Sequence, residues 1–256
     1  MDFRISLLGL FVGVLIGLTG MGGGAIMTPA LILFGIARPA LAVGTDLAWN
    51  ALTKGVGSIV HLRQQTVNTR LVKRLAIGSI PGALCGITLL AILRHHGIKS
   101  EDHLVVMVLG TALIGVALSL FFRTFFGSKL PVIGPEGLSR GPAWLISVLG
   151  LIVGFLVSIT SVGSGSVIVA SLVFIYPTTP LKKLVGSDIL HGLLLVGVSA
   201  IGHMGLGTVD TRLLIGLLIG SVPGVVIGSR LSAIFPERLL RPMLATTLLY
   251  LGARLL

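Results

Sequence analysis

The chain is divided into apolar segments that are long enough to cross a lipid bilayer as helices. Such a helix needs about 20 apolar residues, and segments of about this length occur at roughly 40–62, 72–93, 104–122, 184–204, 213–234 and 239–254. Only 11% of the residues are charged, whereas an ordinary soluble domain has about 25%. The sequence therefore predicts an all-α polytopic membrane protein. It excludes a soluble enzyme, a nucleic-acid-binding protein and a disordered chain.

The charged residues are mostly basic, with 19 Lys and Arg against 8 Asp and Glu. Cytoplasmic loops of membrane proteins collect Lys and Arg, so topology explains most of the excess. Attraction of an anionic substrate is the alternative explanation. The single cysteine, Cys85, excludes a disulfide framework and a cysteine-based metal site. We expect no cofactor and no bound metal, and no cleavable signal peptide is predicted.

Two apolar regions, 5–36 and 143–176, are too long for one helix and too short for two comfortable ones. Small residues interrupt each region near its middle, at 19–24 and at 160–166. Non-helical backbone is tolerated inside a membrane only where protein or a water-filled cavity surrounds it. We therefore expect each region to form a hairpin of two short helices, or one kinked span, with its break facing a cavity. The chain then has about 8–10 helical segments.

The sequence contains an internal duplication. When the chain is shifted by 142 residues, about 19 of the 43 positions in 44–86 are identical to their counterparts. The same shift superposes the two breaks and places Gly23 on Gly165. The sequence therefore predicts two homologous halves: an N-terminal repeat at 1–125, a linking loop at 126–142 and a C-terminal repeat at 143–256.

The orientation of the repeats depends on how the broken regions cross the membrane. If each returns to the side from which it entered, the repeats are inverted, and twelve basic residues lie on one side against six on the other. The richer side, which includes Arg70 and Lys182, is then cytoplasmic. If each region crosses once, the repeats are parallel. The clearer charge asymmetry favours inverted repeats, which are typical of secondary transporters when they carry paired broken helices.

The two breaks form the predicted substrate site. A helix that begins near Gly24 or Ser166 leaves its first N–H groups unpaired and presents the positive end of its dipole. Two such ends near the membrane midplane would bind a small anion. Helix packing is the alternative role for these small residues. The candidate substrate-binding residues are Thr19, Gly20, Gly22, Gly23, Gly24, Ser161, Gly163, Ser164, Gly165 and Ser166.

Polar residues on the helices that follow the breaks are candidates for proton coupling or for polar support of the site. Ionisable groups inside a membrane are costly and usually functional, and a histidine near a carboxylate can relay a proton. The structural alternatives are helix capping by the two aspartates and a buried ion pair between Lys54 and Asp46. The candidates share helix faces by their spacing of three or four residues, and they are Asp46, Asn50, Lys54, Asp188 and His191.

Other classes of activity find less support in the sequence. It has neither a phosphate-binding loop nor a His-Glu-x-x-His motif, so ATP hydrolysis by that loop and metalloprotease activity are not expected. An intramembrane serine hydrolase that uses Ser164 with His191 or His203 is one alternative, although a Ser/His pair has no reason to be duplicated. A channel, or a transporter of another anion or of an anionic lipid, is the other.

Segments 17–24 and 42–46, with Pro29 between them, resemble the TauE/SafE (sulfite exporter) family of membrane permeases. Segments 160–166 and 186–188 are similar to a variant of that pattern. The resemblance implies secondary transport of a small sulfur-containing anion, such as sulfite or an organosulfonate, across the bacterial cytoplasmic membrane. It also implies that both breaks lie near the permeation path. We therefore expect a proton-coupled, multi-pass permease whose partners are a small anion and the lipid bilayer, with a homo-oligomer as an open option.

Overall fold

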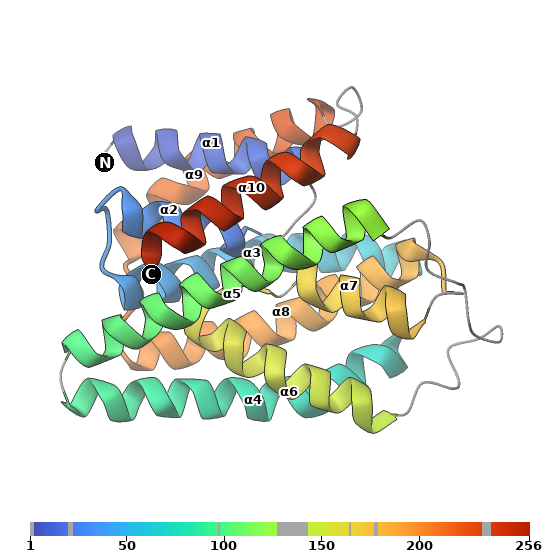
Figure 1. The fold of residues 1–256 in the computed structure, drawn as a ribbon, viewed down its shortest axis with the longest axis horizontal. Coiled ribbons are helices and arrows are strands. Elements are labelled where there is room, and N and C mark those ends of the chain that lie inside the picture. Colours follow the sequence, from blue (N-terminus) through green and yellow to red (C-terminus); the bar gives the residue numbers. More distant parts are fainter. Residues whose placement is uncertain are drawn as a thin grey trace.

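The computed structural model describes residues 3–19, 23–96, 98–126, 143–163, 165–176, 179–231 and 237–256. All ten elements in these residues are helices, which confirms the all-α prediction (Figure 1). They are α1 (Phe3–Thr19), α2 (Gly24–Leu33), α3 (Pro39–Arg63), α4 (Thr69–His96), α5 (Ile98–Phe126), α6 (Ala143–Thr160), α7 (Ser166–Ile175), α8 (Leu181–Gly205), α9 (Thr211–Leu231) and α10 (Glu237–Leu255).

Four of the described helices are long and apolar enough to cross a membrane: Thr69–His95, Glu101–Phe121, Lys182–Gly205 and Thr211–Leu231. Large apolar side chains also cover the outside of the bundle, including Phe11, Ile77 and Ile201, which are 63%, 68% and 70% exposed. Exposed apolar area of this extent is unfavourable in water and favourable against lipid tails. The molecule is a multi-pass membrane protein.

Each of the two broken regions forms two short helices. The second helices, α2 and α7, begin at Gly24 and Ser166, where the sequence predicts them. In Figure 1, α2 runs back toward the end from which α1 came, and α7 runs back beside α6 in the same way. In the second break, Ser161 and Gly163 have φ angles of 61° and 108°, which interrupt the helix.

Close glycine contacts join α1 to α9 and α4 to α6. A Cβ atom at Gly220 of α9 would collide with the carbonyl oxygen of Ser6 in α1. A Cβ atom at Gly78, which aligns with Gly220, would collide with the carbonyl oxygen of Ser147 in α6. Small residues allow helix backbones to approach closely in membranes, where water does not drive the helices together.

These contacts interlock the two halves of the sequence. Helix α1 of the first half packs against α9 of the second, and α6 of the second half packs against α4 of the first. The remaining central pairs, α3 with α8 and α5 with α10, join helices that align in the duplication. One hydrophobic core combines Val12 and Leu31 with Leu217 and Leu248. The repeats therefore exchange helices and do not form two separate bundles.

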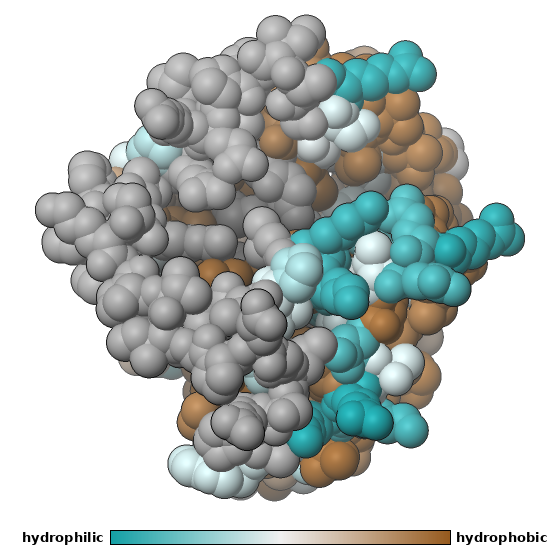
Figure 2. All heavy atoms as spheres, turned by 90° about the vertical axis from the view of Figure 1, so that its right-hand side faces the viewer, coloured by the Kyte–Doolittle hydropathy of each residue, from teal (hydrophilic) through white to brown (hydrophobic). Residues whose placement is uncertain are grey.

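The two ends of the bundle carry different numbers of basic side chains. Figure 2 looks at the right-hand end of Figure 1, where hydrophilic side chains gather among the described residues. The end of α3 and the starts of α4 and α8 lie there, and they bring the exposed side chains of Arg63, Arg70, Lys73, Lys182 and Lys183. We call this the basic end. Arg74 and Arg230 also lie at the basic end, whereas the opposite end, where both termini lie, holds Arg4, Arg38, Arg94, Arg212 and Arg254.

We predict that Gly220→Ala destabilises the protein by about 2 kcal/mol, because the added methyl group overpacks the α1–α9 contact. The control is Gly115→Ala in α5, where a Cβ atom meets open space. That change should stabilise the helix slightly, since alanine favours helix by about 1 kcal/mol over glycine. Thermal unfolding in detergent measures both, and equal midpoints for the two variants would contradict the packing account.

Candidate functional site

A cavity of about 660 Å³ lies between α3, α5, α8 and α9. Gly23, just before α2, and Gly165, just before α7, both line it. The starts of the two short helices therefore reach the same space, as the sequence predicts for a shared site. The lining is mostly apolar, and its polar side chains among the described residues are Asn50, Thr53, Lys54, Ser119, Asp188, Ser221 and Ser229.

The helix starts at this cavity are bare and closely packed. No side chain caps α2 at Gly23 or α7 at Gly165. A Cβ atom at Gly23 would collide with the indole ring of Trp49, and one at Gly24 would collide with the carbonyl oxygen of Ser161 in the other break. Glycine at these positions thus serves close packing between the two breaks and also leaves helix N–H groups uncovered by a side chain beside the cavity.

The carboxylate of Asp46 is held in a buried hydrogen-bonded cluster behind the cavity. The Thr28 hydroxyl donates to Asp46 Oδ2 at 2.7 Å, and Asn50 Nδ2 donates to Asp46 Oδ1 at 3.2 Å. Asn50 Nδ2 also lies 3.5 Å from Ser161 Oγ. This cluster ties α2 and α3 to the second break. Asp46 lies within α3, so the alternative that it caps this helix is excluded.

Asp188 and Lys54 form a second buried polar cluster, and both line the cavity. Asp188 is 3% exposed, and its Oδ1 atom has no hydrogen-bond partner among the described residues. Lys54 is 9% exposed and lies close enough to Asp188 to interact with it electrostatically. The ammonium group of Lys54 packs against Gly192. A Cβ atom at position 192 would lie only 2.5 Å from Lys54 Nζ, so a larger residue would collide with it. The charge beside Lys54 thus comes from Asp188 of the other half, and not from Asp46, the alternative partner on the same helix.

Sequence reasoning missed a pair of equivalent contacts between the repeats. Trp49 Nε1–H donates to Ser221 Oγ at 2.8 Å. His191 Nε2 and Ser79 Oγ, which align with Trp49 and Ser221, share a hydrogen bond of the same length. The internal alignment could have indicated these contacts. It pairs Trp49 with His191, and both serines belong to the repeated segments 78–82 and 220–224. His191 is fully buried and does not line the cavity.

The repeated Gly-Thr/Ser-Asp motif has a structural role in its first two residues. Thr45 Oγ1 accepts a hydrogen bond from the N–H group of Asp210 at 3.0 Å, and Ser187 Oγ accepts one from that of Asn68 at 2.8 Å. Asn68 and Asp210 in turn cap the starts of α4 and α9 with their side chains. The motif therefore docks each half onto the turn that precedes a helix of the other half.

The other predicted residues lie near the breaks or outside the described part of the chain. Gly163 lies in the second break, Thr19 ends α1, and Ser166 begins α7. The predictions for Gly20, Gly22 and Ser164 fall outside the described residues. Within those residues, no group of three or more His, Cys, Asp or Glu side chains is placed to hold a metal ion.

Comparison with known proteins places this geometry in a family. The model of the family "Sulfite exporter TauE/SafE" matches residues 5–255. The chain belongs to the TauE/SafE family. It is 41% identical over 260 residues to the probable membrane transporter protein YjnA of Bacillus subtilis, and the match covers 100% of both chains. The protein is therefore a membrane transporter.

Two further Bacillus subtilis proteins are similar to this TauE/SafE member. The probable membrane transporter protein YdhB is 24% identical, over 98% of this chain and 99% of its own. The probable membrane transporter protein YunE is 32% identical over 45% of this chain and 40% of its own. No solved structure matches the chain significantly.

We predict that Ser221→Ala lowers stability by about 1–3 kcal/mol, because it leaves the buried indole N–H of Trp49 without an acceptor. The measurement uses the Trp144→Phe background, in which Trp49 is the one remaining tryptophan and reports thermal unfolding by its fluorescence. Ser229→Ala on the same helix is the control and should change stability by less than about 0.5 kcal/mol. An unfolding midpoint for Ser221→Ala equal to that of the control would show that the bond contributes nothing.

Proposed function

We propose that this transporter is a secondary permease of the cytoplasmic membrane that moves a small sulfur-containing anion, such as sulfite or an organosulfonate, together with protons. One observation carries the proposal. The bare starts of α2 and α7 and the cationic side chain of Lys54 converge on one cavity. Helix starts favour anions through their free N–H groups and their dipoles, and a buried ammonium group adds a full positive charge.

The size and lining of the cavity favour an anion that carries some carbon. Its volume of about 660 Å³ falls in the range of about 300–1,000 Å³ that is usual for small-molecule sites. Apolar side chains such as Val116, Val167 and Val222 make up most of its wall. An organosulfonate could place its anionic group beside Lys54 and its carbon atoms against these valines. Sulfite would occupy the same polar end with water around it.

Asp188 is the side chain we propose for proton coupling. It is buried beside Lys54, and the Oδ1 atom accepts no hydrogen bond from the described residues. When no anion is bound, the carboxylate would balance the charge of Lys54. An arriving anion would compete with the carboxylate for Lys54, and protonation of Asp188 removes the repulsion between the two. Anion binding and proton uptake are thereby linked.

Inverted repeats would let one site serve both sides of the membrane. Helices that align in the duplication run in opposite directions in Figure 1: α1 against α6, α4 against α9 and α5 against α10. The contacts between elements follow the same exchange, since α1 pairs with α9 as α6 pairs with α4. Both observations support the inverted arrangement, with the basic end facing the cytoplasm.

An intramembrane hydrolase would need a reactive serine next to a histidine, and Ser79 and His191 share a hydrogen bond. Both side chains are fully buried and neither lines the cavity. In the other repeat the histidine is replaced by Trp49, which keeps the hydrogen bond to serine without a basic nitrogen. The pair therefore fits a packing role better than a catalytic one.

We predict that purified protein in proteoliposomes transports sulfite or a short alkylsulfonate, and that Lys54→Gln raises the KM for transport about tenfold or more. Loss of a charge-assisted contact of about 1.5–3 kcal/mol has this effect. Lys73→Gln is the control, because Lys73 is an exposed lysine at the basic end. Equal KM values in the two variants would remove Lys54 from the site, and no flux of any small anion would refute the proposed cargo.

For proton coupling, we predict that Asp188→Asn still binds the anion but no longer accumulates it in response to a pH gradient. The amide resembles the protonated carboxyl group and cannot release a proton. Binding is followed through Trp49 fluorescence in the Trp144→Phe background, and accumulation through tracer flux. Asp210→Asn is the control, since Asp210 caps α9 far from Lys54 and the aligned residue is already Asn68. Gradient-driven accumulation by Asp188→Asn would exclude Asp188 as the proton carrier.

A further inference from the structure

The cavity lies toward one end of the bundle. It is lined by the second halves of α3 and α9, through Thr53, Gly57 and Ser229, and by the first half of α8. All of these segments lie toward the basic end in Figure 1. The opposite end has the equivalent helix segments, so an equivalent opening could form there.

That equivalent space is filled. Gly57 and Val225 line the cavity, and the residues aligned with them, Ser199 and Ala83, are fully buried. Leu195 and Val196, aligned with Thr53 and Lys54, are also 0% exposed and belong to a hydrophobic core. The two repeats thus have different conformations at equivalent places, open at one end and closed at the other.

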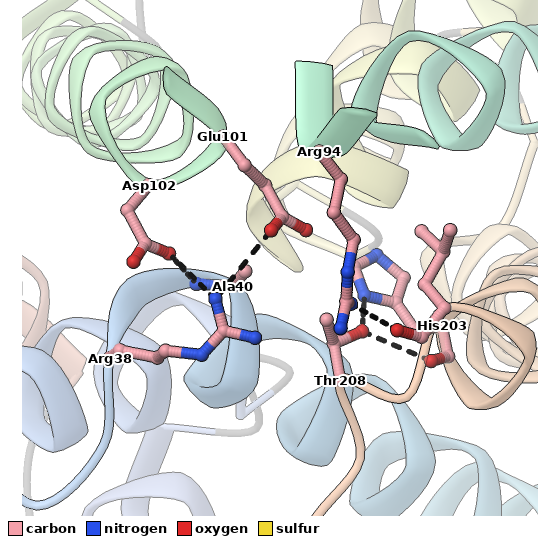
Figure 3. Close-up of polar contacts among 8 residues, drawn as sticks. Arg38, Ala40, Arg94, Glu101, Asp102, His203 and Thr208 are labelled. Atoms are coloured by element: carbon pink, nitrogen blue, oxygen red, sulfur yellow. Dashed lines mark hydrogen bonds and ion pairs between the residues drawn. The ribbon is translucent and has the colours of Figure 1, made fainter. Parts of the chain in front are cut away.

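Charged side chains hold the closed end together, as Figure 3 shows. Arg38, in the turn before α3, points toward two carboxylates at the start of α5. Its Nη1 atom lies 3.5 Å from Glu101 Oε2 and 3.7 Å from Asp102 Oδ1. Asp102 also accepts a hydrogen bond from the backbone N–H of Ala40 at 3.0 Å. The start of α3 is thereby fastened to the start of α5.

A second contact closes the same end between α4 and α8. Arg94, near the end of α4, donates a hydrogen bond to the carbonyl oxygen of Leu206, just after α8. In Figure 3 it points toward the turn that contains His203 and Thr208. This contact holds together the helices whose counterparts, α9 and α3, are separated by the cavity at the basic end.

None of these charged residues is repeated. The positions aligned with Arg38, Glu101 and Asp102 are Pro180, Met243 and Leu244, and Pro236 aligns with Arg94. The open end therefore has no counterpart of this polar cluster in its sequence. A contact that was needed only for folding would be useful at both ends, whereas this one is present only where the path is shut.

The ion pair between Arg38 and Glu101 can separate at a small cost in free energy. Glu101 is 0% exposed, and neither of its carboxylate oxygens has a hydrogen-bond partner in the described part of the chain. Its charge is balanced by Arg38 at 3.5 Å, with Arg94 close enough to contribute. The Arg38 side chain is 31% exposed, so the ion pair lies at the edge of the bundle, where such pairs contribute little to stability. Separation that lets water reach both charges is accordingly inexpensive.

We propose that Arg38, Glu101, Asp102 and Arg94 form a polar gate that closes the permeation path at the end opposite the basic end. The gate opens when the cavity closes. The proposal rests on the proposed transport function, but its structural part makes no reference to the cargo. The gate gives the closed state a contact that breaks when α3 moves away from α5 and α4 from α8. During transport, each repeat then adopts the conformation that the other repeat has in this structure.

The test measures thiol accessibility in a Cys85→Ser background, which has no other cysteine. Ser199→Cys reports on the closed end, and Ser229→Cys reports on the open cavity. A membrane-impermeant methanethiosulfonate reagent is applied to each side of oriented vesicles. With the gate intact, Ser229→Cys should react and Ser199→Cys should be protected. Reaction of Ser199→Cys at a similar rate in the intact protein would overturn the assignment of the closed end.

The gate variant is Glu101→Gln combined with Asp102→Asn, which removes both carboxylates that face Arg38. We expect the Ser199→Cys reaction rate to rise about tenfold, as the population shifts toward the state open at this end, and the Ser229→Cys rate to fall. Asp210→Asn is the matched control, because it removes a negative charge at the same end and leaves the gate unchanged. If the double variant does not fold, Arg94→Gln breaks the second contact and should give the same shift.

Accessibility and flux separate the gate from the proposed cargo. Unchanged reaction rates in folded gate variants would overturn the gate, even if sulfite or an alkylsulfonate is transported by the parent protein. A shift in accessibility would support the gate even if neither anion is transported, and that result would count against the proposed cargo alone.

Discussion

The close approach of helix backbones at glycine is the contact on which the rest of this structure depends. Inside a bilayer, lipid tails are as apolar as the helices, so little drives helices together except close packing and polar contacts. Gly220 and Gly78 allow α9 and α4 to lie directly against α1 and α6. Because each pair joins one helix from each half, these contacts interlock the repeats and bring both breaks to one centre.

The duplication shows which contacts the two repeats share and where the repeats differ. Positions that keep similar side chains in both repeats make equivalent contacts: Thr45 and Ser187 each bind a turn of the other half, and Ser79 and Ser221 each bind an aromatic ring. Some of the positions that line the cavity differ between the repeats. Lys54 aligns with Val196, and Asn50 aligns with Gly192, whose missing side chain leaves room for Lys54. At these places the two repeats therefore differ: one lines a cavity with polar groups, and the other fills the equivalent space with buried side chains.

Predictions from the sequence succeeded where they depended on local rules. Apolar length predicted helices at the six spans, and four of these helices are long and apolar enough to cross a membrane. The glycine-rich and serine-rich segments predicted the helix starts at Gly24 and Ser166, because backbone preferences act over a few residues. Predictions from the sequence failed where contacts between segments far apart in the chain decide which side chains meet. Spacing along α3 paired Lys54 with Asp46, yet the structure places Asp188 of the other half beside it. The alternative that Asp46 and Asp188 cap their helices is excluded, since both lie inside α3 and α8, whereas Asn68 and Asp210 cap α4 and α9.

The sequence by itself determined that this is an all-α membrane protein with two related halves, and the segments 17–24 and 42–46 already indicated its family. Those conclusions need only apolar length, charge density and identity between positions 142 residues apart. Only the tertiary structure decided which polar groups meet, that the halves exchange helices, and that a cavity lies toward one end while Arg38 pairs with Glu101 at the other. These properties depend on contacts between residues far apart in the chain, which a nearly symmetric sequence does not distinguish.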